Sequence, residues 1–153
     1  MKVLASKGAG IFFYKRVNDD VLVALGKRKE SPFKGSWSFA GGNFDRTDAD
    51  LFSCARREAK EEFFYRNTLA FDAIPREVWH ESKKVTLQLG FFHWHAYFVD
   101  VTDLDLVFEK HPGEIEDIKW FYTNNLPLKT LRLVRLELFL AKQRSYFVKN
   151  SRI

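Results

Sequence analysis

Residues 57–62 have the sequence Arg57-Glu58-Ala59-Lys60-Glu61-Glu62, and they follow Gly41-Gly42 after a polar stretch. The glutamates stand at relative positions i, i+3 and i+4, so on an α-helix they share one face. Like charges at this spacing repel one another, and a divalent cation between them would remove that cost. Oxygen-only ligands suit Mg²⁺ or Mn²⁺, and Mg²⁺ usually completes its shell with water and substrate phosphates. The stretch therefore predicts a metal-dependent enzyme that acts on a phosphate compound.

The acidic stretch lies within a long amphipathic segment, for which we predict a helix over residues 48–64. Thr47 or Asp48 is expected to cap this helix, and Thr47 with Asp50 resembles a capping box. Its apolar residues recur at helical spacing, and the glutamates lie beside that apolar stripe. The acids are therefore expected at the edge of the core, where a pocket can form.

The remaining segments alternate between strand and loop patterns. Strands are predicted at residues 8–15, 21–25, 36–40, 70–82, 84–101 (with a bend near Gly90) and 115–122, and a second helix at residues 128–145. This order of elements indicates an α/β (α+β) fold in which a mixed β-sheet packs between helices.

The composition is that of a folded chain, expected to form one domain over residues 1–153. With 46 % hydrophobic residues it is not a disordered protein, and it has no apolar run typical of a signal peptide or membrane span. We expect a cytoplasmic protein without a membrane partner. The single cysteine, Cys54, excludes an intrachain disulfide framework and a cysteine-based zinc site. The net charge of +5 suits an anionic partner, but no segment concentrates it as a nucleic-acid-binding arm would. A homodimer is expected only because such dimers are common.

With these features in this order, the chain resembles the Nudix hydrolase family. The family's signature is a Gly, five residues, a Glu, seven residues, then Arg-Glu, an apolar residue, any residue and Glu-Glu. Gly42 matches the first position, and residues 57–62 match the second half. The resemblance implies a Nudix-type α-β-α sandwich and hydrolysis of a phosphoanhydride bond with Mg²⁺, or Mn²⁺ as its substitute.

The resemblance also implies roles for the matched residues. It assigns Glu58, Glu61 and Glu62 to metal binding, with the backbone carbonyl of Gly42 as a further ligand. Arg57 is expected to hold acids of the site in place by ion pairing; the alternative is an ordinary surface arginine.

The match departs from the signature in the loop. Gly42 precedes Arg57 by fifteen residues instead of fourteen, and Ala40 replaces the usual Pro before the glycine pair. The isolated Glu is missing, and the nearest acids are Asp48 and Asp50. Asp50 is a candidate partner for Arg57.

A general base is needed in addition to the metal. One helix acid, such as Glu61 or Glu62, can serve, and so can Glu114 or Glu116 in the loop before residues 115–122. The alternative for the loop acids is a solvated turn.

Three residues are candidates for substrate binding. Arg28 follows the second strand and can meet phosphates, Trp37 can stack on a base, and Gly41 allows close approach of the backbone. The alternatives are solvated charge, core packing and an ordinary turn.

The expected substrate is a nucleoside diphosphate linked to another group, of the nucleotide sugar, ADP-ribose or nucleoside triphosphate type. Two alternatives stay open. The irregular loop suits a catalytically silent nucleotide-binding module, and the positive charge and aromatic residues suit an RNA-directed (cap-type) pyrophosphohydrolase.

Overall fold

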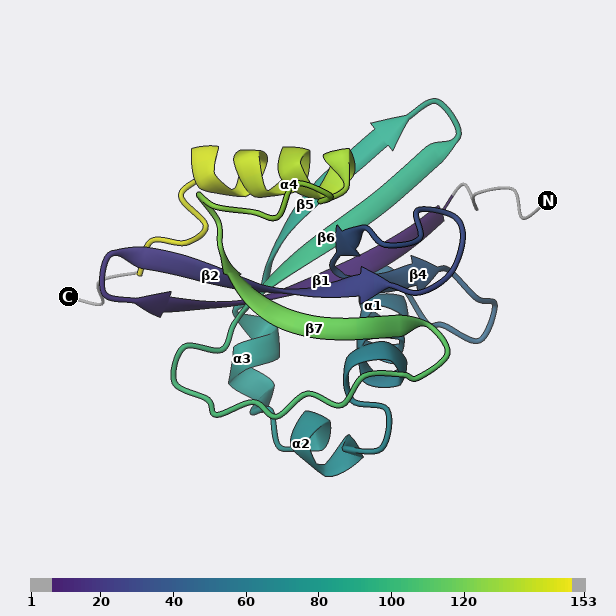
Figure 1. Cartoon of the computed structure of the whole chain (residues 1–153), viewed down its shortest axis with the longest axis horizontal. Coiled ribbons are helices and arrows are strands. Elements are labelled where there is room, and N and C mark those ends of the chain that lie inside the picture. The colour runs from purple at the N-terminus through teal and green to yellow at the C-terminus, as the bar shows by residue number, and fades with distance from the viewer. Residues whose placement is uncertain (1–6, 150–153) are drawn as a thin grey trace.

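The computed structural model describes residues 7–149, in which a seven-stranded mixed sheet lies between helices (Figure 1). Helices α1 (Leu51–Phe63), α2 (Thr68–Asp72) and α3 (Arg76–His80) cover one face, and α4 (Arg132–Gln143) covers the other. The strands are β1 (Lys7–Val17), β2 (Asp20–Arg28), β3 (Trp37–Ser38), β4 (Ala40–Asn43), β5 (Lys83–Leu89), β6 (Phe92–Asp100) and β7 (Ile115–Tyr122). The expected fold, a mixed sheet packed between helices, is confirmed.

The sheet has the order β3-β2-β1-β6-β5, with β4 paired to β1 and β7 paired to β2. Strands β1 and β6 are parallel, and the other pairs are antiparallel. The register of β4 places Gly41 opposite Gly10 and Gly42 opposite Ala9. Small residues on both strands let the backbones approach here, because a Cβ at Gly10 would overlap the Phe39 ring. This pairing fixes the glycine pair beside the central strand.

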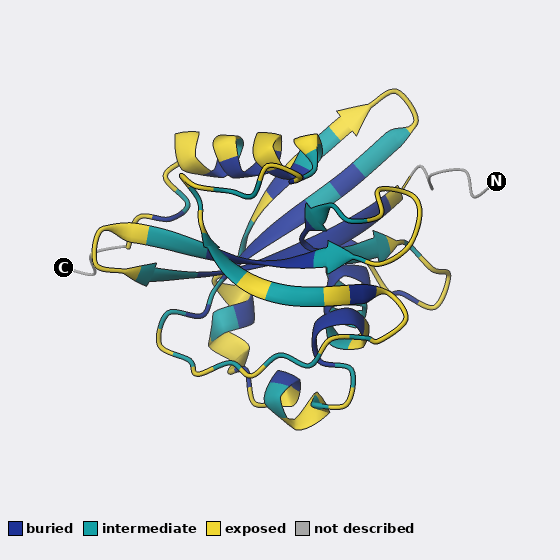
Figure 2. Cartoon of the chain, in the orientation of Figure 1, coloured by how far each residue is buried: buried dark blue, intermediate teal, exposed yellow. Residues whose placement is uncertain are grey.

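The central strand β1 supplies both cores because its side chains alternate between the two faces of the sheet. Ile11 and Phe13 belong to the core under α1, whereas Phe12 and Tyr14 belong to the core under α4. Figure 2 shows the result: the middle of the sheet is buried, and the outer side of α4 is exposed. Burying a side chain as large as Phe contributes about 1.5–3 kcal/mol, so these layers hold the sheet and helices together.

The strand predicted at residues 70–82 is wrong, because this segment forms α2 and α3. Its buried residues Phe71, Ile74 and Trp79 are not spaced for a strand, in which every second side chain faces the core. Pro75 separates the two short helices and stands at the N-cap of α3, where its missing N–H costs nothing.

The segment predicted as one strand over residues 84–101 is a hairpin of β5 and β6. It turns where the bend was predicted, at Gly90, which has a φ of +58°. Both long helices begin about three residues later than predicted. Within residues 7–149, no helix is long and apolar enough to span a bilayer.

The expected caps of α1 are also wrong. Asp50 is the N-cap, and its side chain accepts a hydrogen bond from the Ser53 backbone N–H at 2.7 Å. Thr47 bonds instead to the Asp45 carboxylate, in a turn of the preceding loop. The loop thus makes its own turn before the helix begins, and in this turn Asp48 Oδ2 accepts a hydrogen bond from the Asp45 backbone N–H at 2.9 Å.

Candidate active site

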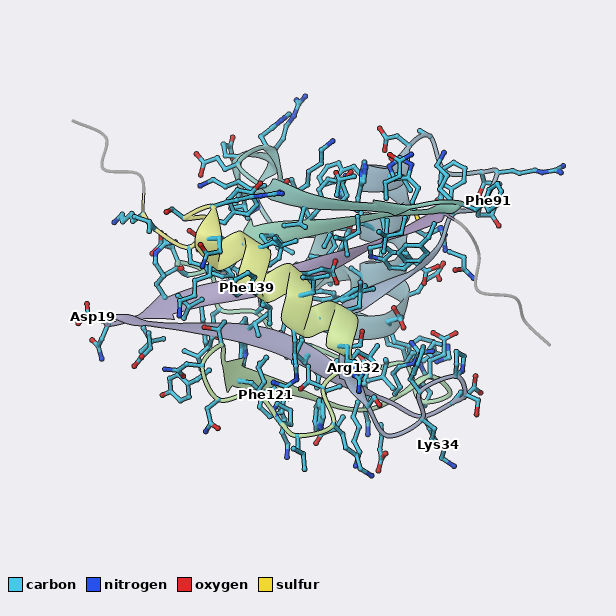
Figure 3. The ribbon with its side chains drawn as sticks, turned by 90° about the horizontal axis from the view of Figure 1, so that it is seen from above. Asp19, Lys34, Phe91, Phe121, Arg132 and Phe139 are labelled. Carbon is cyan, nitrogen blue, oxygen red and sulfur yellow. The ribbon has the colours of Figure 1, made fainter. Side chains whose placement is uncertain are left out.

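The acidic stretch and the glycine pair meet where β4 packs against α1. Asp19, in the β1–β2 turn, lies at the opposite end of the molecule from Lys34 in the β2–β3 loop and from Phe91 at the hairpin tip (Figure 3). Strand β4 lies at the Lys34 end (Figure 1). The candidate site is therefore built at one end of the sheet, from β4, the last two turns of α1 and the neighbouring loops.

Glu62 is the most deeply placed of the acids, with 5 % of its surface exposed. One carboxylate oxygen accepts a hydrogen bond from the Gly41 backbone N–H at 2.8 Å. Burial raises the pKa of Glu62 well above its ordinary value, and the charge of Glu58 raises it further. A cation beside this carboxylate would stabilise its charged form.

Glu58 lies one turn earlier on α1 and faces Gly42. Burial raises its pKa although the Arg57 guanidinium lies next to it. A Cβ at Gly42 would stand 2.6 Å from the Glu58 carboxyl carbon. Only a glycine at position 42 therefore leaves room for the Glu58 side chain in its present position. The Gly42 carbonyl accepts a contact from Cys54 Sγ at 3.8 Å, so the carbonyl faces α1. The Gly42 carbonyl and Glu58 thus meet at one surface of the helix.

Arg57 connects the loop to the helix acids. Its Nε and Nη2 donate to the two oxygens of Asp48 at 2.8 and 2.9 Å, and its Nη1 donates to Glu58 at 2.9 Å. A fourth hydrogen bond runs from Nη2 to the backbone carbonyl of Asn43 at 3.2 Å. The prediction that Asp50 binds Arg57 is wrong, because the Asp50 side chain caps α1.

Asp48 was one of two candidates for the missing acid of the signature. It stands six residues after Gly42, where the signature has its isolated Glu, so the extra residue lies between Asp48 and Arg57. The hydrogen bonds from Arg57 lower the pKa of Asp48 to about 2. Asp48 is therefore charged at any physiological pH, and the shorter acid still reaches the arginine.

Glu61 differs from the other two acids because its side chain is 56 % exposed, and it contacts Arg57 at 3.5 Å. Within residues 7–149, no three His, Cys, Asp or Glu side chains converge as a finished metal site. The donor chemistry nevertheless fits a hard divalent cation: the charge of Glu58 opposes the ionisation of Glu62, and the donors predicted for the ion are all oxygens. Glu61 would complete the set by turning away from Arg57.

The two loop acids lie in different surroundings. The negative charge of Glu114 contributes to the raised pKa of both Glu58 and Glu62, so Glu114 lies within electrostatic reach of them. Glu116 instead faces Lys27, at 3.7 Å. The backbone N–H of Lys29 donates to the Glu114 carbonyl at 2.9 Å, which joins this loop to the end of β2.

The three residues predicted to contact substrate also lie in different surroundings. Arg28 ends β2, donates from Nε to the Pro32 carbonyl at 3.0 Å, and its charge reaches Glu62. Trp37 packs edge-on against Phe121, with ring centroids 4.8 Å apart, so part of it belongs to the core under α4. The Gly41 N–H is already bonded to Glu62, which makes Gly41 a support for that acid.

Phe33 is a further aromatic candidate for stacking on a substrate, in addition to Trp37. Its side chain is 52 % exposed, and its φ of +66° is unusual for a non-glycine residue. It lies on the loop that Arg28 holds through Pro32. A large apolar side chain offered to solvent beside a cation is the signal that could have ranked it first.

Comparison of the fold with solved structures gave several Nudix proteins. A Caenorhabditis elegans Ap4A hydrolase is 18 % identical, with a TM-score of 0.63, over 92 % of this chain and 97 % of that one. The NUDIX domain of Shewanella oneidensis NrtR, solved with ADP ribose, is 17 % identical, with a TM-score of 0.64, over 97 % of this chain and 91 % of that one. A Francisella tularensis bifunctional NMN adenylyltransferase/ADP ribose pyrophosphatase, solved with AMP and a Mn ion, is 15 % identical, with a TM-score of 0.64, over 90 % of this chain and 41 % of that one. At these identities the likeness establishes the shared fold.

Sequence comparison establishes the family. No curated protein matched the sequence. The model of the NUDIX domain matches residues 6–141, which include the glycine pair, Arg57 and all the candidate acids. Because this match covers most of the chain, the protein belongs to the Nudix hydrolase family.

Proposed function

We propose that this protein hydrolyses a phosphoanhydride bond in a nucleoside diphosphate linked to another group, using Mg²⁺ or Mn²⁺. Glu58, Glu61, Glu62 and the Gly42 carbonyl would hold the ion. The observation that carries the proposal is the pair Glu58 and Glu62: two acids one turn apart, both disfavoured as anions by burial, in a protein of net charge +5. Such a pair is costly unless a cation binds there.

The bound ion would supply charge stabilisation on the phosphate oxygens and a lower pKa for a coordinated water. The protein's own residues supply the rest. Arg57 keeps Glu58 in position through a guanidinium anchored on Asp48, and the Gly41 N–H orients Glu62. Glu114 is the better placed of the two loop acids to take a proton from the attacking water, because Glu116 faces Lys27.

The substrate class is supported by the groups around the acids. Arg28 provides a positive charge near Glu62, which suits a second phosphate. Phe33 is exposed on the loop beside it and can stack on a base or another ring. Two of the similar structures were solved with ADP ribose and with AMP, which agrees with a nucleotide ligand.

The test is a substrate panel with product identification. The full chain would be incubated with ADP-ribose, a nucleotide sugar, a nucleoside triphosphate and a dinucleoside polyphosphate, with Mg²⁺, with Mn²⁺ and with EDTA. Turnover in ¹⁸O-labelled water, followed by mass spectrometry, would identify the bond that breaks. We expect hydrolysis that depends on the metal and a loss of about 10²-fold or more in Glu62→Gln.

The matched control is Glu77→Gln, which removes an exposed acid on α3 with the same change of charge. Its rate should equal that of the unmodified protein. Rates in Glu61→Gln and Glu62→Gln that both equal the control would reject the assigned site.

A catalytically silent nucleotide-binding module is the second candidate. The observation in its favour is that no three acids converge within the described residues, with Glu58 bound to Arg57. The same panel separates the two: binding of a nucleotide without any product would favour the silent module.

A further inference from the structure

A pocket, named the second pocket to distinguish it from the candidate active site, lies away from the acidic cluster, between α1, α2 and α3. Its volume is ≈ 510 Å³, within the range of about 300–1,000 Å³ that is typical of small-molecule sites. Besides Asp72 and Ile74, the pocket lining consists of three aromatic side chains, Phe52, Phe71 and Trp79, and three basic ones, Arg56, Arg76 and His80. Apolar walls with a few polar groups are the usual composition of a ligand site.

Arg56 forms the charged wall of this pocket. The guanidinium carbon lies 4.7 Å from the Trp79 ring centroid, 5.6 Å from that of Phe71 and 6.0 Å from that of Phe52. Across residues 7–149, its Nε is buried without a hydrogen-bond partner and its guanidinium forms no ion pair. Contacts with aromatic rings recover part of the cost of removing this charge from water, but they supply no acceptor for its N–H groups. An anion in the pocket would supply this hydrogen-bond acceptor.

The other polar groups leave the pocket positive. Its acid, Asp72, is paired with Lys60 at 3.4 Å and makes no ion pair with Arg56. On the rim, Arg76 Nε donates to His80 Nε2 at 3.1 Å. Arg76 keeps its remaining donors for a ligand.

The pocket is separate from the candidate active site although Arg56 and Arg57 are adjacent in the chain. Consecutive helical residues point about 100° apart, and here Arg57 turns to Asp48 and the acids. Arg56 turns to Trp79 in α3. A ligand in the second pocket would thus contact α1 on a different side from the acidic cluster.

We propose that this pocket binds a small planar molecule that carries an oxyanion, either a carboxylate or a phosphate. The ring lies among Phe52, Phe71 and Trp79, and the oxyanion accepts hydrogen bonds from Arg56 and Arg76. A guanidinium binds either oxyanion through two parallel N–H groups. The ring supplies the apolar area that fills a pocket of this size.

Isothermal titration calorimetry of the full chain tests the proposal. The probes are 1-naphthoate and AMP, with naphthalene-1-methanol and adenosine as their uncharged counterparts. Buffers contain EDTA, so that the acidic cluster repels the same anions. We expect at least one anion to bind with a Kd of about 1 mM or tighter, and its uncharged counterpart to bind about tenfold more weakly. A preference for naphthoate identifies the carboxylate class, and a preference for AMP identifies the phosphate class.

Variants assign the binding to this pocket. Arg56→Gln is expected to weaken it about tenfold or more, and Arg76→Gln, an exposed rim change that leaves the walls intact, by a smaller factor. The control is Arg66→Gln, which removes an exposed arginine 5.4 Å from the Tyr65 ring, outside the pocket. Thermal unfolding of each variant shows whether it is folded. The proposal is overturned if neither anion binds, if the uncharged probes bind equally well, or if Arg76→Gln and a folded Arg56→Gln both bind like the control.

Discussion

Arg57 and Asp48 form a two-point ion pair, in which Nε and Nη2 of the arginine donate to the two carboxylate oxygens at 2.8 and 2.9 Å. The remaining nitrogen of the same guanidinium donates to Glu58. Because the guanidinium is planar and rigid, fixing two of its nitrogens also fixes the third. Through Arg57, Asp48 in the loop therefore determines the position of the Glu58 carboxylate on the helix.

Asp48→Asn is expected to lower kcat about 10- to 100-fold without unfolding the protein. The amide can accept only one of the two hydrogen bonds from Arg57, and it loses the charge that holds the guanidinium. Steady-state kinetics over a Mg²⁺ titration measure this effect, and a higher Mg²⁺ requirement should accompany the lower kcat.

Asp50→Asn is the matched control, since it makes the same change two residues away. Asp50 caps α1 and does not contact Arg57, and Asn caps a helix as well as Asp does. Its kcat and its Mg²⁺ requirement should match those of the unmodified protein. Equal losses in the two variants would show that the loop as a whole, and not the pair of Asp48 with Arg57, determines activity.

Gly41→Ala and Gly42→Ala are expected to fail in different ways. A Cβ at Gly41 would stand 2.7 Å from the backbone of Ala9 and of Gly10, which cannot move without shifting β1. We expect Gly41→Ala to lower the free energy of unfolding by about 1–3 kcal/mol. The nearest atoms to a Cβ at Gly42 all belong to the Glu58 carboxyl group, which can rotate away.

Gly42→Ala should therefore unfold at nearly the same temperature as the unmodified protein but hydrolyse substrate about tenfold more slowly. Thermal unfolding and kcat, measured on both variants, test the distinction. A Gly42→Ala variant with full activity would show that the position of Glu58 beside Gly42 is not needed.

The sequence predicted the helix that carries the glutamates better than it predicted the short elements after it. The glutamates share a helix face by spacing alone, and a mixed sheet between helices follows from the order of strand and helix patterns. The exact partner of Arg57 could not be predicted, because it depends on the turn at Asp45, in which the Asp45 backbone N–H donates to Asp48 Oδ2 and positions this carboxylate. The short helices α2 and α3 were missed because runs of five residues carry too little periodicity to separate helix from strand.

Glu114→Gln is expected to lower kcat about 10²-fold, whereas Glu116→Gln should change it by less than about twofold. Glu114 lies within electrostatic reach of Glu58 and Glu62, and Glu116 faces Lys27. The two variants control for each other, since both remove one exposed acid from the same segment. A kcat that falls in Glu116→Gln but not in Glu114→Gln would reverse the assignment.

Glu137 is fully buried on α4, among the apolar residues that pack on the sheet, and neither of its carboxylate oxygens has a hydrogen-bond partner within the described residues. Burial raises its pKa well above the ordinary value of 4.5. The folded protein therefore keeps a proton on Glu137 that the unfolded chain releases once the pH rises above 4.5. Its contribution to the free energy of unfolding is complete below that pH and is lost as the pH rises toward the folded-state pKa.

We therefore expect Glu137→Gln, which cannot ionise, to lose less stability than the unmodified protein between pH 5 and pH 8, by about 1–3 kcal/mol. Glu58 and Glu62 titrate in the same direction, but they are unchanged in the variant, so the difference between the two proteins isolates Glu137. Urea unfolding in EDTA at each pH measures it, and Glu77→Gln controls for the change in net charge. Parallel stability curves for Glu137→Gln and the unmodified protein would show that the Glu137 carboxyl group ionises equally in the folded and unfolded states.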